Sequence, residues 1–144
     1  MTTIPQDLLA NWEIMVVDDE DDSLEVARYI LTFYGATVHT AINGVDALKV
    51  LETVRPRFII SDISMPQMDG WALIAKIQED VALKDVPVIA LTAHAMRGDR
   101  EKAISAGFHN YLIKPLTPST FMAQLVRLLI DIPQFEGQFK HVEL

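Results

Sequence analysis

Apolar residues recur along the chain in two alternating patterns. Short runs rich in β-branched residues, such as EIMVV at 13–17, are typical of buried strands. Longer segments carry apolar residues at helical spacing, as Leu24, Ala27 and Leu31 do within residues 23–35. The pattern predicts strands over residues 13–17, 36–41, 57–61, 86–92 and 109–113, and helices over residues 23–35, 44–54, 70–80, 96–107 and 118–131.

Capping residues mark the ends of several predicted helices. Asn43 and Asp69 precede two helices, where a side-chain oxygen accepts hydrogen bonds from free backbone N–H groups. Gly35 and Gly107 end two others, and Pro118 falls in the first turn of the last helix.

Five strand–helix repeats predict an α/β fold with a parallel sheet and helices on both faces. Right-handed crossovers and the length of the repeat region favour a flavodoxin-like, doubly wound (βα)5 arrangement with strand order 2-1-3-4-5. We expect one domain over residues 13–131, an N-terminal extension over 1–12 and a C-terminal tail over 132–144, neither with a clear element of its own. Within the extension, Leu8, Leu9 and Trp12 predict a short amphipathic turn that packs on the domain.

Composition narrows the classes of function. The 144 residues carry a net charge of −8, which argues against nucleic-acid binding because that requires a basic face. Cysteine is absent, so the chain has neither disulfides nor thiolate metal sites. No signal peptide or apolar run of about 20 residues is present, so we expect a cytoplasmic domain without a membrane partner.

Polar residues follow the apolar strands at the edge where such folds bind ligands. Asp18 and Asp19 follow the first strand, Asp62 the third, Thr92 ends the fourth and Lys114 follows the fifth. In an open α/β sheet this edge, at the carboxyl ends of the strands, is the usual ligand site. Each residue alone has an ordinary explanation, as a solvated acidic turn, a loop cap, a strand end or a surface lysine. Their joint placement on one edge indicates a site.

The grouped carboxylates suggest a metal ion and phosphoryl chemistry. Neighbouring carboxylates repel one another, so fold stability gives no reason to collect them. Mg²⁺ prefers oxygen ligands and often uses one or two carboxylates together with a phosphate. A lysine and a hydroxyl can neutralise and position a phosphoryl group, and a carboxylate can be the nucleophile that forms an aspartyl phosphate.

Four motifs carry a resemblance to a known family. The chain resembles the receiver domain of two-component response regulators in VVDDE (16–20), SDISMPQMDG (61–70), ALTAHAM (90–96) and YLIKP (111–115). The similarity covers residues 13–131. The region that begins with ALTAHAM looks especially like receivers of hybrid histidine kinases and of stand-alone phosphorelay regulators.

The resemblance implies a role for each site residue. Asp62 matches the phosphoacceptor, and Thr92 and Lys114 match the hydroxyl and the cation that bind the phosphoryl group. Asp18, Asp19, Asp62 and the backbone carbonyl of Ser64 match the ligands of Mg²⁺ or Mn²⁺. Thr92 and Tyr111 match the conformational switch, and the Lys114–Pro115 bond matches a cis peptide.

Two positions bear on how long the phosphoryl group lasts. Ser64 and His94 lie two residues after Asp62 and Thr92, at places that vary within the family. His94 either shields the phosphoryl group from water or lines the partner surface. A zinc site at His94 and His109 is disfavoured, because their spacing suggests none.

We therefore expect a single-domain response regulator that takes a phosphoryl group from a histidine kinase or histidine phosphotransfer protein. It would not be a turnover enzyme, although it would catalyse its own phosphorylation and slow dephosphorylation. Its downstream protein target would bind the face made by the fourth helix, fifth strand and fifth helix, and the chain would be a monomer or weak dimer.

Other classes of function stay open at this point. One is a constitutive protein-interaction module with an unused acid site, which the complete set of acid, threonine and lysine disfavours. Another is a receiver domain cut from a hybrid histidine kinase. An aspartyl phosphohydrolase would carry a second acid where Ser64 stands, and a flavodoxin would carry a phosphate-binding loop after the first strand.

Overall fold

The computed structural model describes residues 4–93 and 99–142. Its elements, in chain order, are β1 (Glu13–Val17), α1 (Asp21–Phe33), β2 (Thr37–Ala41), α2 (Gly44–Val50), β3 (Phe58–Asp62), α3 (Gly70–Glu79), β4 (Val88–Thr92), α4 (Asp99–Ala106), β5 (Asn110–Ile113), α5 (Pro118–Ile130) and the 3₁₀ helix η1 (Pro133–Phe135). Among the described residues, no helix combines the length and the apolar character that a membrane span requires.

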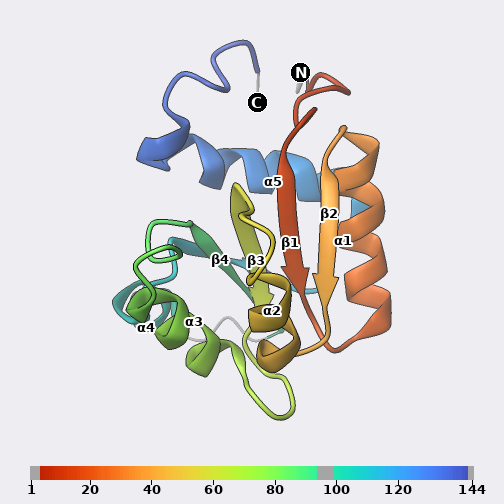
Figure 1. The fold of residues 1–144 in the computed structure, drawn as a ribbon. Helices are drawn as coiled ribbons and strands as arrows, with labels where there is room; N and C mark the ends of the chain where they lie inside the picture. The colour runs from red at the N-terminus through yellow and green to blue at the C-terminus, as the bar shows by residue number, and fades with distance from the viewer. Residues whose placement is uncertain (1–3, 94–98, 143–144) are drawn as a thin grey trace.

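The five strands form one parallel sheet in the order β2-β1-β3-β4-β5, which confirms the predicted topology. All neighbouring strands pair in parallel, as the arrows of β1, β2 and β3 in Figure 1 illustrate, so their carboxyl ends share one edge of the sheet. β1 lies between β2 and β3, so the order of the strands reverses beside it. The functional site is therefore expected where β1 and β3 end together.

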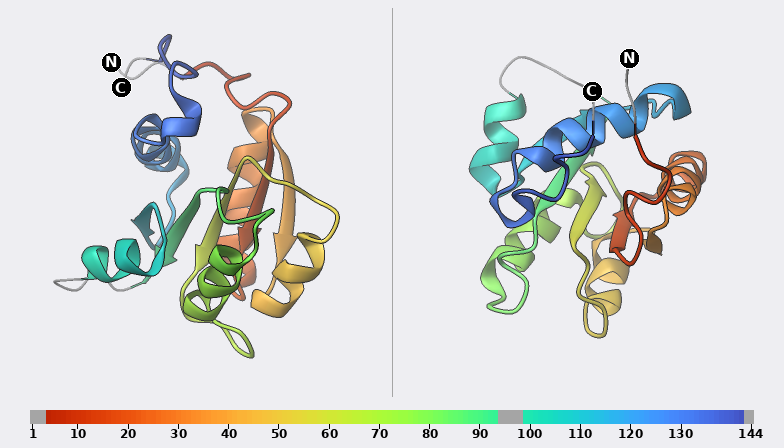
Figure 2. Two further views of the ribbon diagram at one scale, coloured as in Figure 1. Left: turned by 60° about the vertical axis from the view of Figure 1, so that its left-hand side comes forward. Right: turned by 90° about the horizontal axis from the view of Figure 1, so that it is seen from above.

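Each face of the sheet has its own apolar core, because successive side chains of a strand point to opposite faces. Ile14 and Val16 of β1 pack with α1 and α5, whereas Met15 and Val17 pack on the side of α2, α3 and α4. The same alternation continues through β3 and β4. Figures 1 and 2 show the resulting three layers.

The segments that flank the domain also belong to the core. Leu8, Leu9 and Trp12 are buried, which confirms that the N-terminal extension packs on the domain. The tail forms η1 and buries Phe135, whose ring centroid lies 4.9 Å from that of Trp12. The expectation that the tail lacks an element of its own was therefore wrong. Both flanking segments lie at the end of the molecule opposite the carboxyl edge of the sheet (Figures 1 and 2).

Several element boundaries differ from the predicted ones, among them the ends of α2 and β3. Helix α2 stops at Val50 rather than at residue 54, because the next turn tightens to bonds such as Glu52 N–H to Lys49 O and Thr53 N–H to Val50 O. Strand β3 extends to Asp62, which pairs with Leu91 of β4. The candidate nucleophile is thus part of the sheet itself.

Candidate functional site

Asp62 stands at the carboxyl end of β3, in the middle of the sheet, and only 4% of its surface is exposed. The start of α3 lies directly against this position. A Cβ atom at Gly70 would lie 2.4 Å from the carbonyl oxygen of Asp62, so only glycine fits there. Asp69, the residue before Gly70, is the N-cap of α3. Its side chain accepts a hydrogen bond from Ala72 N–H, as predicted. The surrounding backbone therefore holds the carboxylate in a fixed place.

Lys114 brings a cation to the same point. Its Nζ atom lies 3.2 Å from Asp62 Oδ2, 3.1 Å from Asp18 Oδ2 and 2.5 Å from Glu20 Oε1. The backbone N–H of Lys114 donates to the carbonyl of Thr92 at 2.7 Å, which joins the ends of β4 and β5. The Lys114–Pro115 bond is cis, as predicted. The ammonium thus bridges carboxylates from β3 and from the segment after β1.

Burial and charge shift the pKa values of this pair. Burial raises the pKa of Asp62 to about 7, and the charge of Asp18 adds to the rise while Lys114 opposes it. Burial disfavours the charged form of Lys114, but its contacts with Glu20, Asp18 and Asp62 outweigh this effect and raise its pKa. Lys114 therefore stays protonated at neutral pH, whereas Asp62 holds a proton more readily than an ordinary aspartate.

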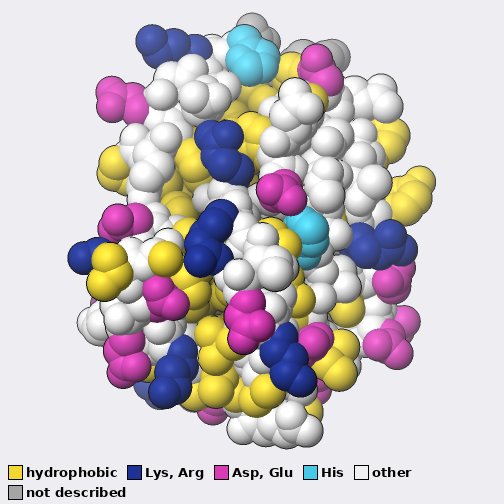
Figure 3. All heavy atoms as spheres, in the orientation of Figure 1, with side chains coloured by type: hydrophobic (Ala, Val, Ile, Leu, Met, Phe, Trp, Pro, Cys, Tyr) yellow, Lys and Arg dark blue, Asp and Glu magenta, His cyan; other side chains and the backbone are white. Residues whose placement is uncertain are grey.

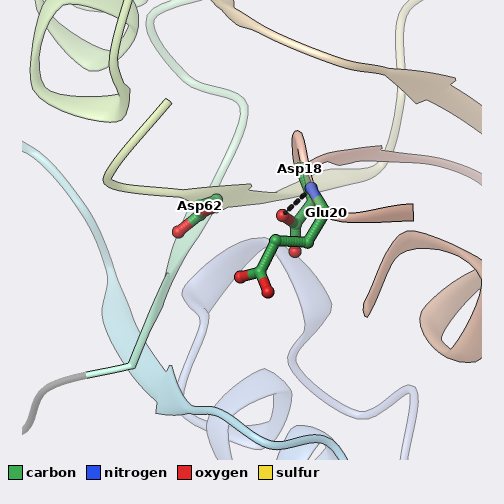
Figure 4. Close-up of side chains that lie close together, drawn as sticks. All are labelled: Asp18, Glu20 and Asp62. Carbon is green, nitrogen blue, oxygen red and sulfur yellow. Dashed lines mark hydrogen bonds between the residues drawn. The ribbon is translucent and has the colours of Figure 1, made fainter. Parts of the chain in front are cut away.

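Three carboxylates meet at this edge, as Figure 4 shows. One oxygen each of Asp18, Glu20 and Asp62 lies within 4.8 Å of the others. Asp18 is fully buried, and its Oδ1 accepts a hydrogen bond from Glu20 N–H at 2.9 Å. Its Oδ2 accepts no hydrogen bond from any described residue, although it lies near the Lys114 ammonium. A buried carboxylate oxygen without a hydrogen-bond donor is a suitable ligand for a hard cation.

The carboxylate cluster in the structure differs by one residue from the one predicted from the sequence. Asp18 and Asp62 lie together as expected, but the third carboxylate is Glu20, which sequence reasoning did not select. Asp19 instead is exposed and lines an open pocket of about 480 Å³ together with Ser64 and Asp69. The sequence signal that could have identified Glu20 is its place in the acidic run 18–22. In the structure its side chain extends over the edge of the sheet towards Asp62.

The two proposed switch residues line one cavity. Thr92 ends β4 and Tyr111 lies in β5, and both are half-buried. They face a space of about 180 Å³ that Ile63, Trp71, Asp99, Lys102 and Ala103 also line. His94 lies outside the described residues, so the structure tests neither its role near the phosphoryl group nor the disfavoured zinc site.

The geometry agrees with comparisons to known proteins. A family model described as the response regulator receiver domain matches residues 14–126. The chain belongs to this family. Receiver domains act in two-component systems, bind Mg²⁺ at an acidic site and interact with histidine kinases or phosphotransfer proteins and with downstream targets. This receiver domain has an acidic cluster, formed by Asp18, Glu20 and Asp62.

Individual relatives support the same assignment. The receiver domain is 41% identical to the "Uncharacterized 14.6 kDa protein in sodA1 3'region" of Leptolyngbya boryana, over 84% of this chain and 89% of that protein. It is 30% identical to the polar-differentiation response regulator DivK of Brucella anthropi, over 82% and 96%. Among solved structures, the receiver domain of a signal transduction histidine kinase from Syntrophus aciditrophicus matches with a TM-score of 0.73 and 31% identity, over 88% of this chain and 96% of that one.

Some relatives are about as long as this chain, and others are about twice as long. The chain covers most of the proteins just described, but it spans only about half the length of several other curated relatives, between 50% and 54%. The receiver domain is what all of them share with this chain.

Proposed function

We propose that Asp62 of this receiver domain accepts a phosphoryl group from a phosphohistidine on a histidine kinase or phosphotransfer protein, in the cytoplasm and in a Mg²⁺-dependent reaction. One observation carries the proposal. The buried carboxylate of Asp62 ends the central strand with the ammonium of Lys114 3.2 Å from its Oδ2 atom and the buried Asp18 carboxylate beside it. Nucleophile, cation and metal-binding acid are thereby held in one place by three strand ends.

In the transfer, one oxygen of the Asp62 carboxylate attacks the phosphorus atom. The P–N bond of the phosphohistidine breaks, and its electron pair stays on the imidazole nitrogen. Lys114 is placed to neutralise an oxygen of the phosphoryl group, since it already contacts Asp62. The Thr92 side chain would donate a hydrogen bond to another oxygen. The rigid sheet supplies the positioning on which phosphoryl transfer mainly depends.

The metal would be held by Asp18, Asp19, Asp62 and the backbone carbonyl of Ser64. Asp18 and Asp62 lie together in the cluster, and Asp19 and Ser64 line the adjoining pocket. When bound, Mg²⁺ supplies positive charge that favours the ionised form of Asp62 and offsets the charge of the phosphoryl group. Asp18 Oδ2 lies 3.1 Å from Lys114 Nζ, so a bound metal would share this oxygen with the ammonium.

The output of the proposed reaction is a conformational change read by a protein target. Thr92 and Tyr111 line the same cavity, so a change at the Thr92 hydroxyl can alter the space open to the Tyr111 ring. The face of α4, β5 and α5 carries a hollow lined by Tyr111, Ile113, Gln124 and Arg127. Aromatic, aliphatic and arginine side chains of this kind suit a protein partner.

Charge on the molecule agrees with a protein rather than a nucleic-acid partner. The side chains on the face shown in Figure 3 mix both signs, without a large basic region. The net charge is −8. On this proposal the chain acts as a phosphoacceptor rather than a turnover enzyme, and as a monomer or weak dimer.

Intact mass spectrometry with a small acyl-phosphate donor tests the proposal. The wild-type chain should gain one phosphoryl group with Mg²⁺ and none when the metal is chelated. Asp62→Asn should gain none, whereas Asp22→Asn, an exposed acid in the first turn of α1, should behave as wild type. A wild-type chain that never gains the mass would favour the constitutive interaction module instead.

A further inference from the structure

Trp71 forms a wall between two cavities that serve different parts of the proposed mechanism. It lines the open pocket that holds Asp19 and Ser64, which are proposed metal ligands. It also lines the cavity shared by Thr92 and Tyr111, the proposed switch. Any movement of the indole ring therefore changes both spaces.

The backbone ties Trp71 to the strand that carries Asp62. The preceding residue, Gly70, donates its N–H to the carbonyl of Ile63 at 2.8 Å. Gly70 also approaches the Asp62 carbonyl so closely that a Cβ atom there would lie 2.4 Å from it. Trp71 is thus one residue from a direct backbone contact with the proposed phosphoacceptor.

On its other side, Trp71 contacts α4 and the segment that follows it. The Nζ atom of Lys102 lies 4.9 Å from the centroid of the Trp71 ring, within the range of a cation–π interaction. The buried ring of Phe108 meets the indole edge-on, with centroids 5.7 Å apart. The indole therefore joins α3 to α4 and to the segment between α4 and β5.

Helix α4 has few other apolar contacts to hold it. Ala103 is the only buried residue among its eight, Asp99–Ala106. Ala106 is half-buried and also packs against the core, so the contacts of α4 with the core come from small side chains. A helix held by so few contacts is easily displaced, because each one is a large share of what holds it. The contact between Lys102 and Trp71 is one of these.

We propose that the Trp71 indole and the Lys102 ammonium form a latch that holds α4 in its resting position. Trp71 is then a positioning residue that couples the state of Asp62 to α4, beside the Thr92–Tyr111 pair. This coupling rests on the proposed phosphorylation of Asp62. The latch is weak, because Lys102 is exposed, and a cation–π contact at an exposed site changes an equilibrium by about two- to fivefold. Such a size suits a population shift rather than a rigid lock.

Two substitutions at Lys102 separate its charge from its bulk. Lys102→Met keeps a long apolar chain over the indole but removes the charge, whereas Lys102→Arg keeps the charge. Lys76→Met, at an exposed position of α3, is the matched control. Hydrogen exchange of the α4 amides in the metal-free, unphosphorylated chain should rise about two- to fivefold in Lys102→Met and stay at the wild-type rate in the other two variants.

The second measurement is the level of Asp62 phosphorylation at a limiting concentration of acyl phosphate with Mg²⁺. If the latch opposes the phosphorylated state, Lys102→Met should raise that level, because the unlatched form that favours phosphorylation is then more populated. Lys102→Arg and Lys76→Met should leave it unchanged.

Each outcome decides a separate step. Unchanged α4 exchange in Lys102→Met, or an equal rise in Lys102→Arg, would overturn the latch. Faster exchange without a change in phosphorylation level would overturn the coupling through Trp71. If wild type gains no phosphoryl group, the proposed function fails and the coupling fails with it, whereas the exchange rates still report whether the latch exists.

Discussion

Lys114 Nζ lies 3.2 Å from Asp62 Oδ2, yet the pKa of Asp62 is raised to about 7. The cation does not offset the burial of the carboxylate and its proximity to Asp18. The resting site thus carries more negative charge than Lys114 alone balances. A divalent cation would supply the remainder, which links the electrostatics of the site to its proposed use.

This imbalance predicts how stability depends on pH. The pKa of Asp62 is near 3.9 in the unfolded chain and about 7 in the folded one, so the folded state holds an extra proton between these values. Protonation of Asp62 therefore adds to the free energy of unfolding. This stabilisation is fully present below about pH 4 and is lost as the pH rises through about 7, by an amount on the order of 4 kcal/mol. Asp62→Asn should lack this loss.

Urea unfolding without metal, from pH 4 to 8, measures the effect. The free energy of unfolding of Asp62→Asn relative to wild type should grow with pH across this range. Mg²⁺ should stabilise wild type more at pH 8 than at pH 5, because it binds the folded, ionised site. A difference between the two proteins that stays flat with pH would contradict the raised pKa.

Removal of the cation should have the opposite effect. Lys114→Met leaves Asp18 and Asp62 buried without their ammonium partner, so we expect a loss of about 3 kcal/mol at pH 8. The loss should be smaller at pH 5, where Asp62 is protonated. Lys84→Met, an exposed lysine between α3 and β4, is the control and should change stability by less than about 0.5 kcal/mol. Equal losses at the two pH values would show that Lys114 contributes mainly by packing.

The flanking segments should contribute to stability as the core does. Leu9 is fully buried and Phe135 is 3% exposed against Trp12, so Leu9→Ala should cost about 2–5 kcal/mol and Phe135→Ala about 3–5 kcal/mol. Val81→Ala, at a side chain that is 82% exposed, is the control. Chemical denaturation gives the values. A Phe135→Ala variant as stable as the control would show that the tail is an accessory segment.

The sequence predicts the position of a site residue well when that residue stands at the end of a strand, and poorly when a long side chain decides where its charge lies. Asp18, Asp62 and Lys114 were found because parallel strands bring their carboxyl ends to one edge, so a position at a strand end implies a position in space. Glu20 was missed because a long flexible side chain, not a strand end, carries its carboxylate to Lys114. Position along the chain does not encode which way such a side chain folds.

The flanking segments show a second limit. Residues 132–139 are too short to show a clear period, so no helix or strand could be assigned there. The available signal was the spacing of Phe135 and Phe139, four residues apart, both of which pack against Trp12. Arg57 also lies over the Trp12 ring at 4.1 Å, a contact between distant parts of the chain that no local pattern specifies.

The proposed switch can be separated from phosphorylation itself. Thr92→Ala keeps Asp62, Lys114 and Asp18, so it should still gain a phosphoryl group with Mg²⁺. It should lose most of the change that a beryllofluoride mimic causes at the Tyr111 ring and in α4, because the hydroxyl that joins the two is gone. NMR spectra with and without the mimic report this directly. A full wild-type response in Thr92→Ala would show that the signal leaves Asp62 by another route.

The most direct test of the central claim is to locate the phosphoryl group on the chain. After treatment with acyl phosphate and Mg²⁺, borohydride reduces an aspartyl phosphate to homoserine, which tandem mass spectrometry of peptides identifies by position. We predict homoserine at position 62 alone, and none when Mg²⁺ is chelated or in Asp62→Asn. Homoserine at position 18 or 19, or its formation at position 62 without Mg²⁺, would contradict the account.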